Sequence, residues 1–206
     1  MSRPEGSQAP DMFYDADEAF KYNASSRMNN VQREITERAI EMLALPDGKR
    51  CYLLDIGCGS GLSGEVLDEN DHYWVGCDIS TDMLTLAVAK EFETGDVLAS
   101  DIGQGLPFRP ATFDGVISIS AIQWLCYSDS SEQDPKLRLN RFFSSLYSIL
   151  KRSAKAVLQF YPESPEQAVL IAQAATRVGF AGGVVVDYPN SSKRKKVRIT
   201  SYINII

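Results

Sequence analysis

The stretch that most constrains the fold is Leu53 to Leu62, with the sequence LLDIGCGSGL. A short apolar run carries one carboxylate, Asp55, and passes into three closely spaced glycines, after which residues 62 to 67 have the pattern of a helix. Glycines are needed where the backbone takes a positive φ or where a ligand lies against it, and the free N–H groups of the new helix face that ligand. The stretch therefore predicts a strand, a tight turn and a helix start that together bind a cofactor.

Two classes of cofactor fit such a turn. Residues 59 to 64 match the dinucleotide pattern G-x-G-x-x-G, and Asp78, about 20 residues further on, stands where a ribose-binding acid is expected. Asp55 precedes the glycines, where a carboxylate disfavours a pyrophosphate but suits the ammonium and sulfonium groups of S-adenosylmethionine. We therefore expect the methyl donor, and a dehydrogenase is a distant alternative. Residues 54 to 61 resemble the first motif of class I S-adenosylmethionine-dependent methyltransferases.

Length and composition indicate one domain. With 206 residues, 44% of them apolar, the chain can bury one sizeable core. We expect residues 1–24 to form a polar leader and a helix that covers the cofactor, and residues 25–206 to form the methyltransferase domain. The N-terminus lacks a signal sequence, and no run approaches the roughly 18 apolar residues that would span a bilayer, so we expect a soluble intracellular protein.

The cysteines and the single histidine, His72, argue against two kinds of site. The cysteines form no C-x-x-C pair, which disfavours structural zinc, and one histidine disfavours a Ser-His-Asp triad. We expect no metal site, and thiols in a reducing compartment.

The remaining pattern predicts an alternation of helices and strands. Five parallel strands with crossovers and a closing hairpin would give the class I, Rossmann-like α/β fold, a seven-stranded, mostly parallel sheet with helices on both faces. A capping serine at Ser25 or Ser26 is expected to begin the second helix. The expected helices are 13–22, a long one that stops at Pro46, 62–67, 83–91, 136–150 and 165–178; the expected later strands are 73–78, a short one before the acid Asp101 within 95–102, 115–120, 156–161, 183–188 and 197–203.

Two strand ends supply candidate donor-binding residues. Asp78 ends a buried strand, where its carboxylate can accept both ribose hydroxyls, and Ile79 can lie against the adenine face. Asp101 follows the next strand and is placed to accept from the adenine amino group, beside the backbone of Ile102. A helix cap is the alternative role for Asp78.

Side chains at the junction of the first two helices are a second group of candidates. Lys21, Tyr22 and Arg27 combine two cations with an aromatic ring, and these could close over a ligand that carries a carboxylate and an adenine. They could equally be ordinary surface residues.

The acceptor is expected beside the strand that runs into residues 121–125. The N/D-P-P-Y/F motif that methylates exocyclic amines is absent, because residues 118–121 stand in its place. Cys126 lacks the Pro-Cys context and the neighbouring base of a pyrimidine C5 nucleophile, so we expect a buried structural thiol. An acceptor that is nucleophilic by itself, such as guanine N7, needs orientation and desolvation more than a base.

A basic segment lies between the last two expected strands. The net charge is −6, and removing the five positive charges of Lys193, Arg194, Lys195, Lys196 and Arg198 would take it to −11. The positive charge is therefore local, which suits a polyanion docked at one edge and argues against nonspecific coating of nucleic acid. A solvated hairpin loop is the alternative.

Segments spread over nearly the whole chain resemble one family, the eukaryotic 18S rRNA guanine-N7 methyltransferases, which are named for their bud-site-selection member in yeast. These segments are 13–14, 21–22, 26–28, 72–76, 117–125 and 179–189. The resemblance implies methylation of a guanine in small-subunit rRNA during ribosome assembly, in the nucleus and nucleolus and also in the cytoplasm, as a heterodimer with a small zinc-binding activator.

The resemblance implies that Gly57, Gly59, Asp78, Asp101 and Ile102 hold the donor and that Trp124 and the residues before it shape the acceptor pocket. Together with the residues argued from their own chemistry, those expected to bind the donor are Tyr22, Arg27, Asp55, Gly57, Cys58, Gly59, Asp78, Ile79, Asp101, Ile102 and Ser118. Those expected to position the acceptor are Ser120, Gln123 and Trp124, and those expected to bind RNA are Lys193, Arg194, Lys195 and Lys196. The family usually carries a lysine- and arginine-rich extension after the catalytic domain, whereas this sequence ends at Ile206.

The activator has an independent argument. In the class I strand order the third strand, near Asp96 to Ala99, lies at a sheet edge, where Val97 and Leu98 leave only Asp96 to discourage pairing. An edge of this kind accepts a strand from another chain. We therefore expect the activator to dock against this strand and the helix before it.

Two further functions stay open. A small-molecule methyltransferase of quinone or sterol type fits Leu106-Pro107-Phe108 and Phe113-Asp114 equally well, but it has no use for the basic segment. A non-catalytic ribosome-assembly platform would keep the fold without turnover, and the intact Gly57, Asp78 and Asp101 argue against it.

Overall fold

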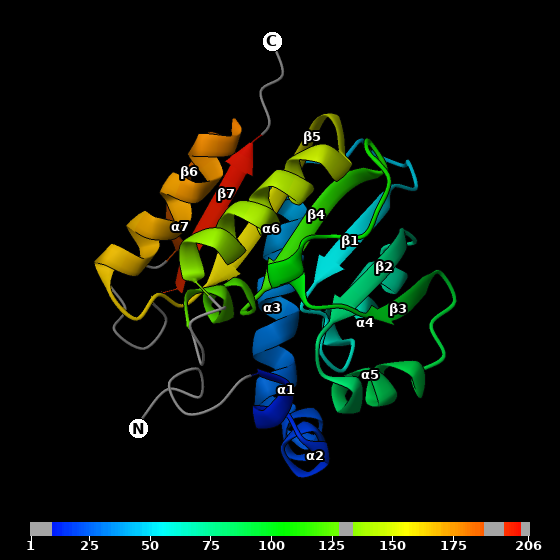
Figure 1. Cartoon of the computed structure of the whole chain (residues 1–206). Coiled ribbons are helices and arrows are strands. Elements are labelled where there is room, and N and C mark those ends of the chain that lie inside the picture. Colours follow the sequence, from blue (N-terminus) through cyan, green and yellow to red (C-terminus); the bar gives the residue numbers. More distant parts are fainter. Residues whose placement is uncertain (1–9, 128–133, 188–195, 203–206) are drawn as a thin grey trace.

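The chain is a three-layer α/β structure in which one sheet lies between two layers of helices (Figure 1). The computed structural model describes residues 10–127, 134–187 and 196–202. The strands are β1 (Tyr52–Ile56), β2 (Tyr73–Asp78), β3 (Gly95–Ala99), β4 (Phe113–Ile119), β5 (Leu150–Phe160), β6 (Ala181–Asp187) and β7 (Lys196–Tyr202). The helices are α1 (Pro10–Phe13), α2 (Ala16–Ala24), α3 (Ser26–Leu43), α4 (Leu62–Glu69), α5 (Thr81–Val88), α6 (Pro135–Ile149) and α7 (Pro165–Val178), with short 3-10 helices η2 (Ile102–Gln104) and η3 (Ile122–Cys126).

The strand order is β3-β2-β1-β4-β5-β7-β6. Strands β1 to β5 form the parallel part, and β7 pairs antiparallel with both β5 and β6. The chain thus has the expected class I α/β arrangement, in which five strands are parallel and the other two close the sheet as a hairpin. Because β1 has β2 on one side and β4 on the other, the strand order reverses at β1, and ligands bind at the carboxyl ends of strands at such a point.

Helix boundaries follow local capping. Ser25 precedes α3, and its Oγ accepts from the N–H of Met28, which confirms the expected cap. The helix expected over 13–22 is present as α2, but it begins only at Ala16 and follows the separate short helix α1. The break is at Asp15, whose Oδ1 accepts from the N–H groups of Asp17 and Glu18 at 3.1 and 3.0 Å and so starts a new helix. The boundary expected at residue 24 coincides with the end of α2, and the covering role of residues 1–24 stays a prediction.

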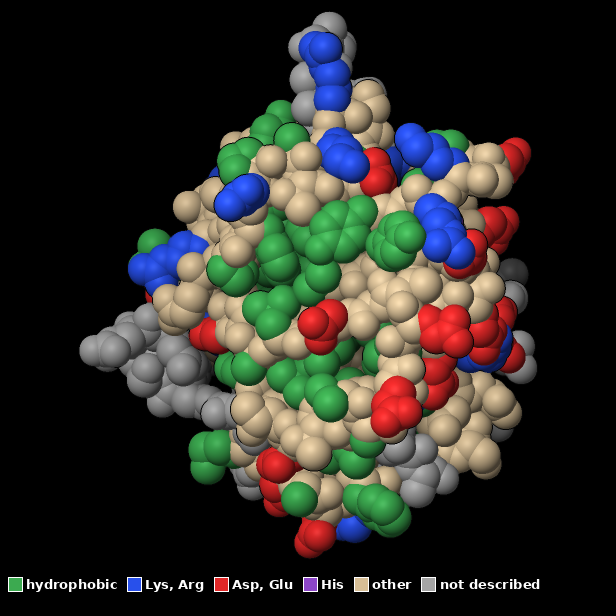
Figure 2. Space-filling view, turned by 90° about the vertical axis from the view of Figure 1, so that its right-hand side faces the viewer, with side chains coloured by type: hydrophobic (Ala, Val, Ile, Leu, Met, Phe, Trp, Pro, Cys, Tyr) green, Lys and Arg blue, Asp and Glu red, His purple; other side chains and the backbone are tan. Residues whose placement is uncertain are grey.

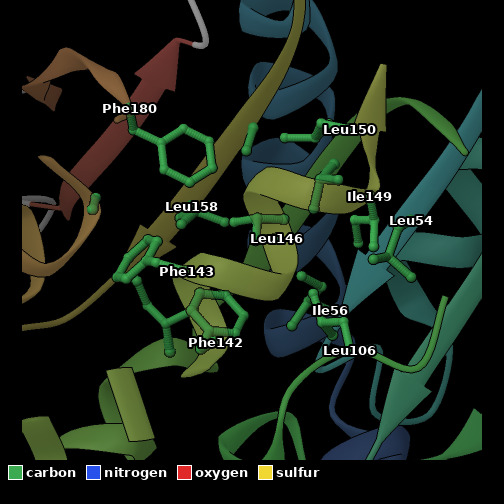
Figure 3. Close-up of a cluster of buried hydrophobic side chains, with 14 of the residues drawn as sticks. Leu54, Ile56, Leu106, Phe142, Phe143, Leu146, Ile149, Leu150, Leu158 and Phe180 are labelled. Carbon is green, nitrogen blue, oxygen red and sulfur yellow. The ribbon is translucent and has the colours of Figure 1, made fainter. Parts of the chain in front are cut away.

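Two apolar cores lie on the opposite faces of the sheet. Successive strand residues point to opposite faces, so Leu54 of β1 packs beneath α6 and α7, whereas Leu53 packs against α3. Phe142, Phe143 and Leu146 project from α6 into the first core (Figure 3). Within the part of the chain described, no helix is long and apolar enough to cross a bilayer. The cores fix the parallel strands rigidly and leave their carboxyl ends to form the site.

Candidate active site

The glycine turn joins the end of β1 to α4. Gly57, Gly59 and Gly61 have φ values of 71°, 53° and 76°, in the left-handed region that favours glycine. The N–H of Gly57 donates to the carbonyl of Cys77 in β2 at 2.8 Å, which ties the turn to the sheet. A Cβ at Gly57 would lie only 2.2 Å from Cβ of Ala121. The turn therefore needs glycine at position 57 for both conformation and space.

Asp78 connects this turn to the next helix. Its Oδ2 accepts from the N–H of Gly59 at 2.9 Å, and its Oδ1 accepts from the N–H of Ser80, also at 2.9 Å. Burial raises the pKa of this carboxyl, and the backbone hydrogen bonds oppose that rise. Ser80, and not Asp78, caps α5, since its Oγ accepts from the N–H of Met83. Each oxygen of Asp78 retains a further lone pair with which it can accept from a ligand.

Asp101 lies in the loop after β3, beyond the last strand residue, Ala99. It precedes η2, and its Oδ1 accepts from the N–H of Gly103 at 2.8 Å and from Nη2 of Arg138 at 3.1 Å. Ile102 follows it on the wall of the same pocket. The loop after β3 is thus held in place by a residue of α6, far along the chain.

One pocket opens at the carboxyl ends of these strands. It encloses about 910 Å³ of space, part of it open to solvent. The expected site residues on its wall are Gly57, Cys58, Gly59, Asp78, Ile79, Asp101, Ile102, Ser120 and Trp124. The pocket therefore brings together the donor-side residues expected between positions 57 and 102 and the acceptor-side residues Ser120 and Trp124.

Three other expected residues lie behind this wall. Asp55 is completely buried and accepts from the hydroxyl of Ser63, and burial raises the pKa of the Asp55 carboxyl to about 7. Ser118 donates through Oγ to the carbonyl of Ile56 at 2.8 Å, and Gln123 donates through Nε2 to the carbonyl of Ser120 at 2.7 Å. These side chains do not line the pocket; Ser118 and Gln123 hold neighbouring backbone, and Asp55 holds the side chain of Ser63.

The remaining expected residues fall outside the described side chains. Tyr22 lies in α2 and Arg27 in α3, but their side chains are not among those that the structure describes. Residues 193–195 lie outside the described ranges, and Lys196 is described only as the first residue of β7. Their roles in donor and RNA binding stay predictions.

The acceptor side of the pocket is formed where β4 ends. Ser120 has a φ of 59°, an uncommon conformation for a residue other than glycine. Gln159 of β5 holds it there: the Ser120 N–H donates to the Gln159 carbonyl at 2.9 Å, and the Ser120 Oγ donates to Oε1 of Gln159 at 2.8 Å. Trp124 is 8% exposed and packs against Phe13 and Tyr14, with ring centroids 6.1 Å apart in both pairs. This side of the pocket is thus formed by aromatic rings and a small side chain, and hydrogen bonds to Gln159 hold the backbone of Ser120 in place.

Sequence reasoning missed several residues of the wall. They are Tyr14, Gln32, Ser60, Met83 and Arg138. Ser60 stood inside the glycine motif, so its position was a usable signal. Arg138 gave a weaker one, as a cation next to the apolar stripe of its helix. For Tyr14 the signal was the family resemblance of residues 13–14 alone, since its carbonyl accepts from Ser80 Oγ at 2.8 Å across 66 residues, a contact that no local pattern shows.

The residues present fit S-adenosylmethionine. The buried Ser60 Oγ and Arg138 Nε both belong to residues of the pocket wall, and neither atom has a hydrogen-bond partner within the described ranges. Asp78 can accept from ribose hydroxyls, and Asp101 from an exocyclic amine, while Ile79 and Met83 supply apolar surface. Across the residues that the structure places, no group of His, Cys, Asp and Glu side chains could hold a metal ion.

Two solved structures share the fold. A TehB-like S-adenosylmethionine-dependent methyltransferase from Corynebacterium glutamicum superposes with a TM-score of 0.67 at 16% identity, covering 91% of this chain and 98% of that one. The methyltransferase chain of a complex with the Trm112 methyltransferase activator of Haloferax volcanii superposes with a TM-score of 0.59 at 17% identity, covering 90% and 97%. At these identities the likeness establishes the class I methyltransferase fold alone.

Relatives found by sequence identify the family more narrowly than the fold does. Residues 54–158 match the family model described as a methyltransferase domain. The 18S rRNA (guanine-N(7))-methyltransferase of Mus musculus is 59% identical over 194 residues, which are 94% of this chain and 69% of that protein. The corresponding enzyme of Saccharomyces cerevisiae is 52% identical over 192 residues, which are 93% of this chain and 69% of that protein. The chain therefore belongs to the 18S rRNA (guanine-N7)-methyltransferase family of S-adenosylmethionine-dependent enzymes.

Proposed function

We propose that this protein methylates N7 of a guanine in small-subunit 18S rRNA during ribosome assembly. The observation that carries the proposal is a pocket that fits the methyl donor but lacks a general base on its acceptor side. In the described part of that side, formed by Ser120, Ala121, Trp124 and Tyr14, no Asp, Glu, His or Lys lines the wall. The family supplies the substrate class, since relatives of high identity carry the name of this activity.

The chemistry asks little of the protein beyond orientation. S-adenosylmethionine, when bound, supplies an electrophilic methyl group on a sulfonium. Guanine N7 attacks with an in-plane lone pair, so the N7–methyl bond forms as the sulfur–methyl bond breaks, and no proton has to be removed. The residues of this chain then align the purine and exclude water. The rings of Trp124 and Tyr14, packed edge to face, supply aromatic surface against which a base can pack.

The proposal includes a small zinc-binding activator that docks at the β3 edge. β3 is the outermost strand on its side of the sheet, as expected from the sequence. Val97 and Leu98 are half-buried and pack inward onto opposite cores, so an arriving chain would meet backbone groups and the exposed Asp96. Oδ1 of Asp96 accepts from the N–H of Val97 at 2.8 Å and occupies a donor that a partner strand could use.

The surface on this side supports the same proposal. Figure 2 shows the side of the molecule on which β3 and α5 lie in Figure 1, and hydrophobic side chains gather near the middle of that face. Val88, at the end of α5, is 63% exposed. An edge strand beside exposed apolar side chains suits a partner that adds a strand and covers a helix. The methyltransferase bound to an activator in the solved complex has the same fold.

Hydrogen exchange can test the docking site. With the activator bound, the amides of residues 95–99 should exchange more slowly, because a partner strand would protect them. Protection confined to the segment around residues 193–196 would contradict this placement. That segment is proposed instead to contact RNA, and the protein to act in the nucleus and nucleolus as well as in the cytoplasm.

The decisive test is methyl transfer from labelled S-adenosylmethionine to precursors of the small ribosomal subunit. The purified chain is tested alone and with the activator, and the labelled base is mapped. Label at a guanine N7, dependent on the activator, is the expected result. Donor binding without RNA labelling would favour either a small-molecule methyltransferase or an assembly platform, and a screen of quinone and sterol acceptors then separates these two.

A further inference from the structure

Helix α6 carries the loop that follows β3. Residues 138, 141 and 145 lie on one face of the helix, since they are three and four positions apart. Their contacts to residues 101–106 are Arg138 Nη2 to Asp101 Oδ1 at 3.1 Å, Arg141 Nη1 to Gln104 Oε1 at 3.3 Å, and the N–H of Leu106 to Ser145 Oγ at 3.0 Å. Of these three residues of α6, only Arg138 reaches the pocket wall.

Arg138 is fixed more firmly than an ion pair alone requires. The residue is 7% exposed, and its guanidinium lies against the backbone of Gly103, where an added Cβ would be 2.3 Å from Arg138 Nε. Nε has no hydrogen-bond partner within the described part of the chain, although it is buried. A buried donor without a partner is costly, so its position on the wall of a ligand pocket points to a ligand acceptor.

Asp101 is oriented by the same contact. Its Oδ1 accepts two hydrogen bonds, from Arg138 and from the N–H of Gly103, which leaves Oδ2 as the acceptor for a ligand. Oδ2 can only accept while the carboxylate is ionised, and Arg138 Nε can only donate. The pair thus combines an acceptor with a neighbouring buried donor on the pocket wall that the loop after β3 helps to form.

That pattern matches one base edge. The adenine amino group is a donor flanked by ring nitrogens that accept, whereas a 6-oxo purine presents a carbonyl acceptor beside an N–H donor. We propose that Arg138 reads the adenine of the methyl donor together with Asp101, and that it is a specificity-determining residue of the donor site. The carboxylate alone selects the amino group; Arg138 adds selection of the neighbouring ring nitrogen.

The test uses donor product and no RNA, so its outcome is independent of the proposed acceptor. Calorimetry compares S-adenosylhomocysteine with S-inosylhomocysteine, which differs only in its 6-oxo base. The wild-type chain should prefer the adenine form by about 10- to 100-fold or more, as a two-bond readout of a base provides. Arg138→Met should weaken binding of the adenine form about tenfold and reduce the preference by a similar factor. Arg138→Lys should recover part of the affinity, through the charge beside Asp101, but not the preference.

Two further variants separate readout from folding. Gly103→Ala keeps the arginine but pushes its Nε aside, and should lower the preference in the same direction as Arg138→Met. Arg141→Met is the matched control on the same helix face, and should leave both affinities unchanged. If Arg138→Met weakens both ligands by the same factor, or if the preference survives in both Arg138→Met and Gly103→Ala, the proposal is overturned.

Discussion

The contact between Gly57 and Ala121 predicts that the donor turn and the acceptor loop are energetically coupled. Gly57→Ala introduces two separate costs. The φ of 71° is unfavourable for any L-residue with a Cβ, by about 1 to 2 kcal/mol. The new Cβ would also lie 2.2 Å from Cβ of Ala121, and overpacking of this kind costs about 1 to 3 kcal/mol. The free energy of unfolding should therefore fall by about 2 to 5 kcal/mol in total.

The two costs can be separated with matched variants. Gly48 has a φ of 66°, and a Cβ added there would meet no atom within 4 Å, so Gly48→Ala should show the conformational cost alone, about 1 to 2 kcal/mol. Ala121→Gly removes the obstructing methyl group. In a double-mutant cycle, Gly57→Ala combined with Ala121→Gly should recover about 1 to 3 kcal/mol relative to additivity.

Urea denaturation followed by tryptophan fluorescence measures these differences, and calorimetry with S-adenosylhomocysteine reports the donor site. Gly57→Ala should weaken donor binding, and the double variant should restore part of it. A coupling energy within about 0.5 kcal/mol of zero would refute the argument, because independent sites add within that margin. Equal costs for Gly57→Ala and Gly48→Ala would refute it as well.

Three further predictions concern carboxylates. Burial raises the pKa of Asp55 from 3.8 to about 7, so the folded chain binds this proton more tightly than the unfolded chain. The free energy of unfolding should therefore fall as the pH rises from 3.8 to about 7, by up to about 4 kcal/mol. Asp55→Asn should flatten that part of the profile in urea titrations, and parallel profiles would exclude Asp55 as the cause. Asp78→Asn should weaken S-adenosylhomocysteine binding at least about tenfold by calorimetry, whereas the exposed Asp82→Asn should not; equal affinities would mean that the ribose lies elsewhere. Asp96→Ala should speed amide exchange at Val97 in the free protein, and an unchanged rate would contradict the capping role.

The parts of the site that could be predicted from the sequence are those formed by neighbours in the chain. The glycine turn and the acids after β2 and β3 are local patterns, because a strand, its last residue and the following turn are adjacent in sequence. The edge position of β3 followed from the class I strand order, and the fold confirms it.

The parts that could not be predicted depend on how distant elements dock. Arg138 reaches Asp101 across 37 residues because α6 packs beside η2, and no local pattern carries that information. Ser118 and Gln123 were expected in the pocket, but strand alternation and the turn of η3 direct their side chains to backbone carbonyls instead. On such an element, the position of a residue along the chain decides whether its side chain faces the pocket. A neighbour one position away faces the wall behind it instead.

The carboxylate of Asp96 is a reversible cap on the free edge of the sheet. It accepts the hydrogen bond of the Val97 N–H within the same strand, so leaving this edge without a partner strand costs the protein little stability. A strand that pairs with β3 at Val97 has to displace the exposed side chain of Asp96, which rotation about its χ angles allows. Association through this edge should therefore proceed at the rate of ordinary protein docking, about 10⁵ to 10⁷ M⁻¹s⁻¹, with the lifetime of the complex set by dissociation.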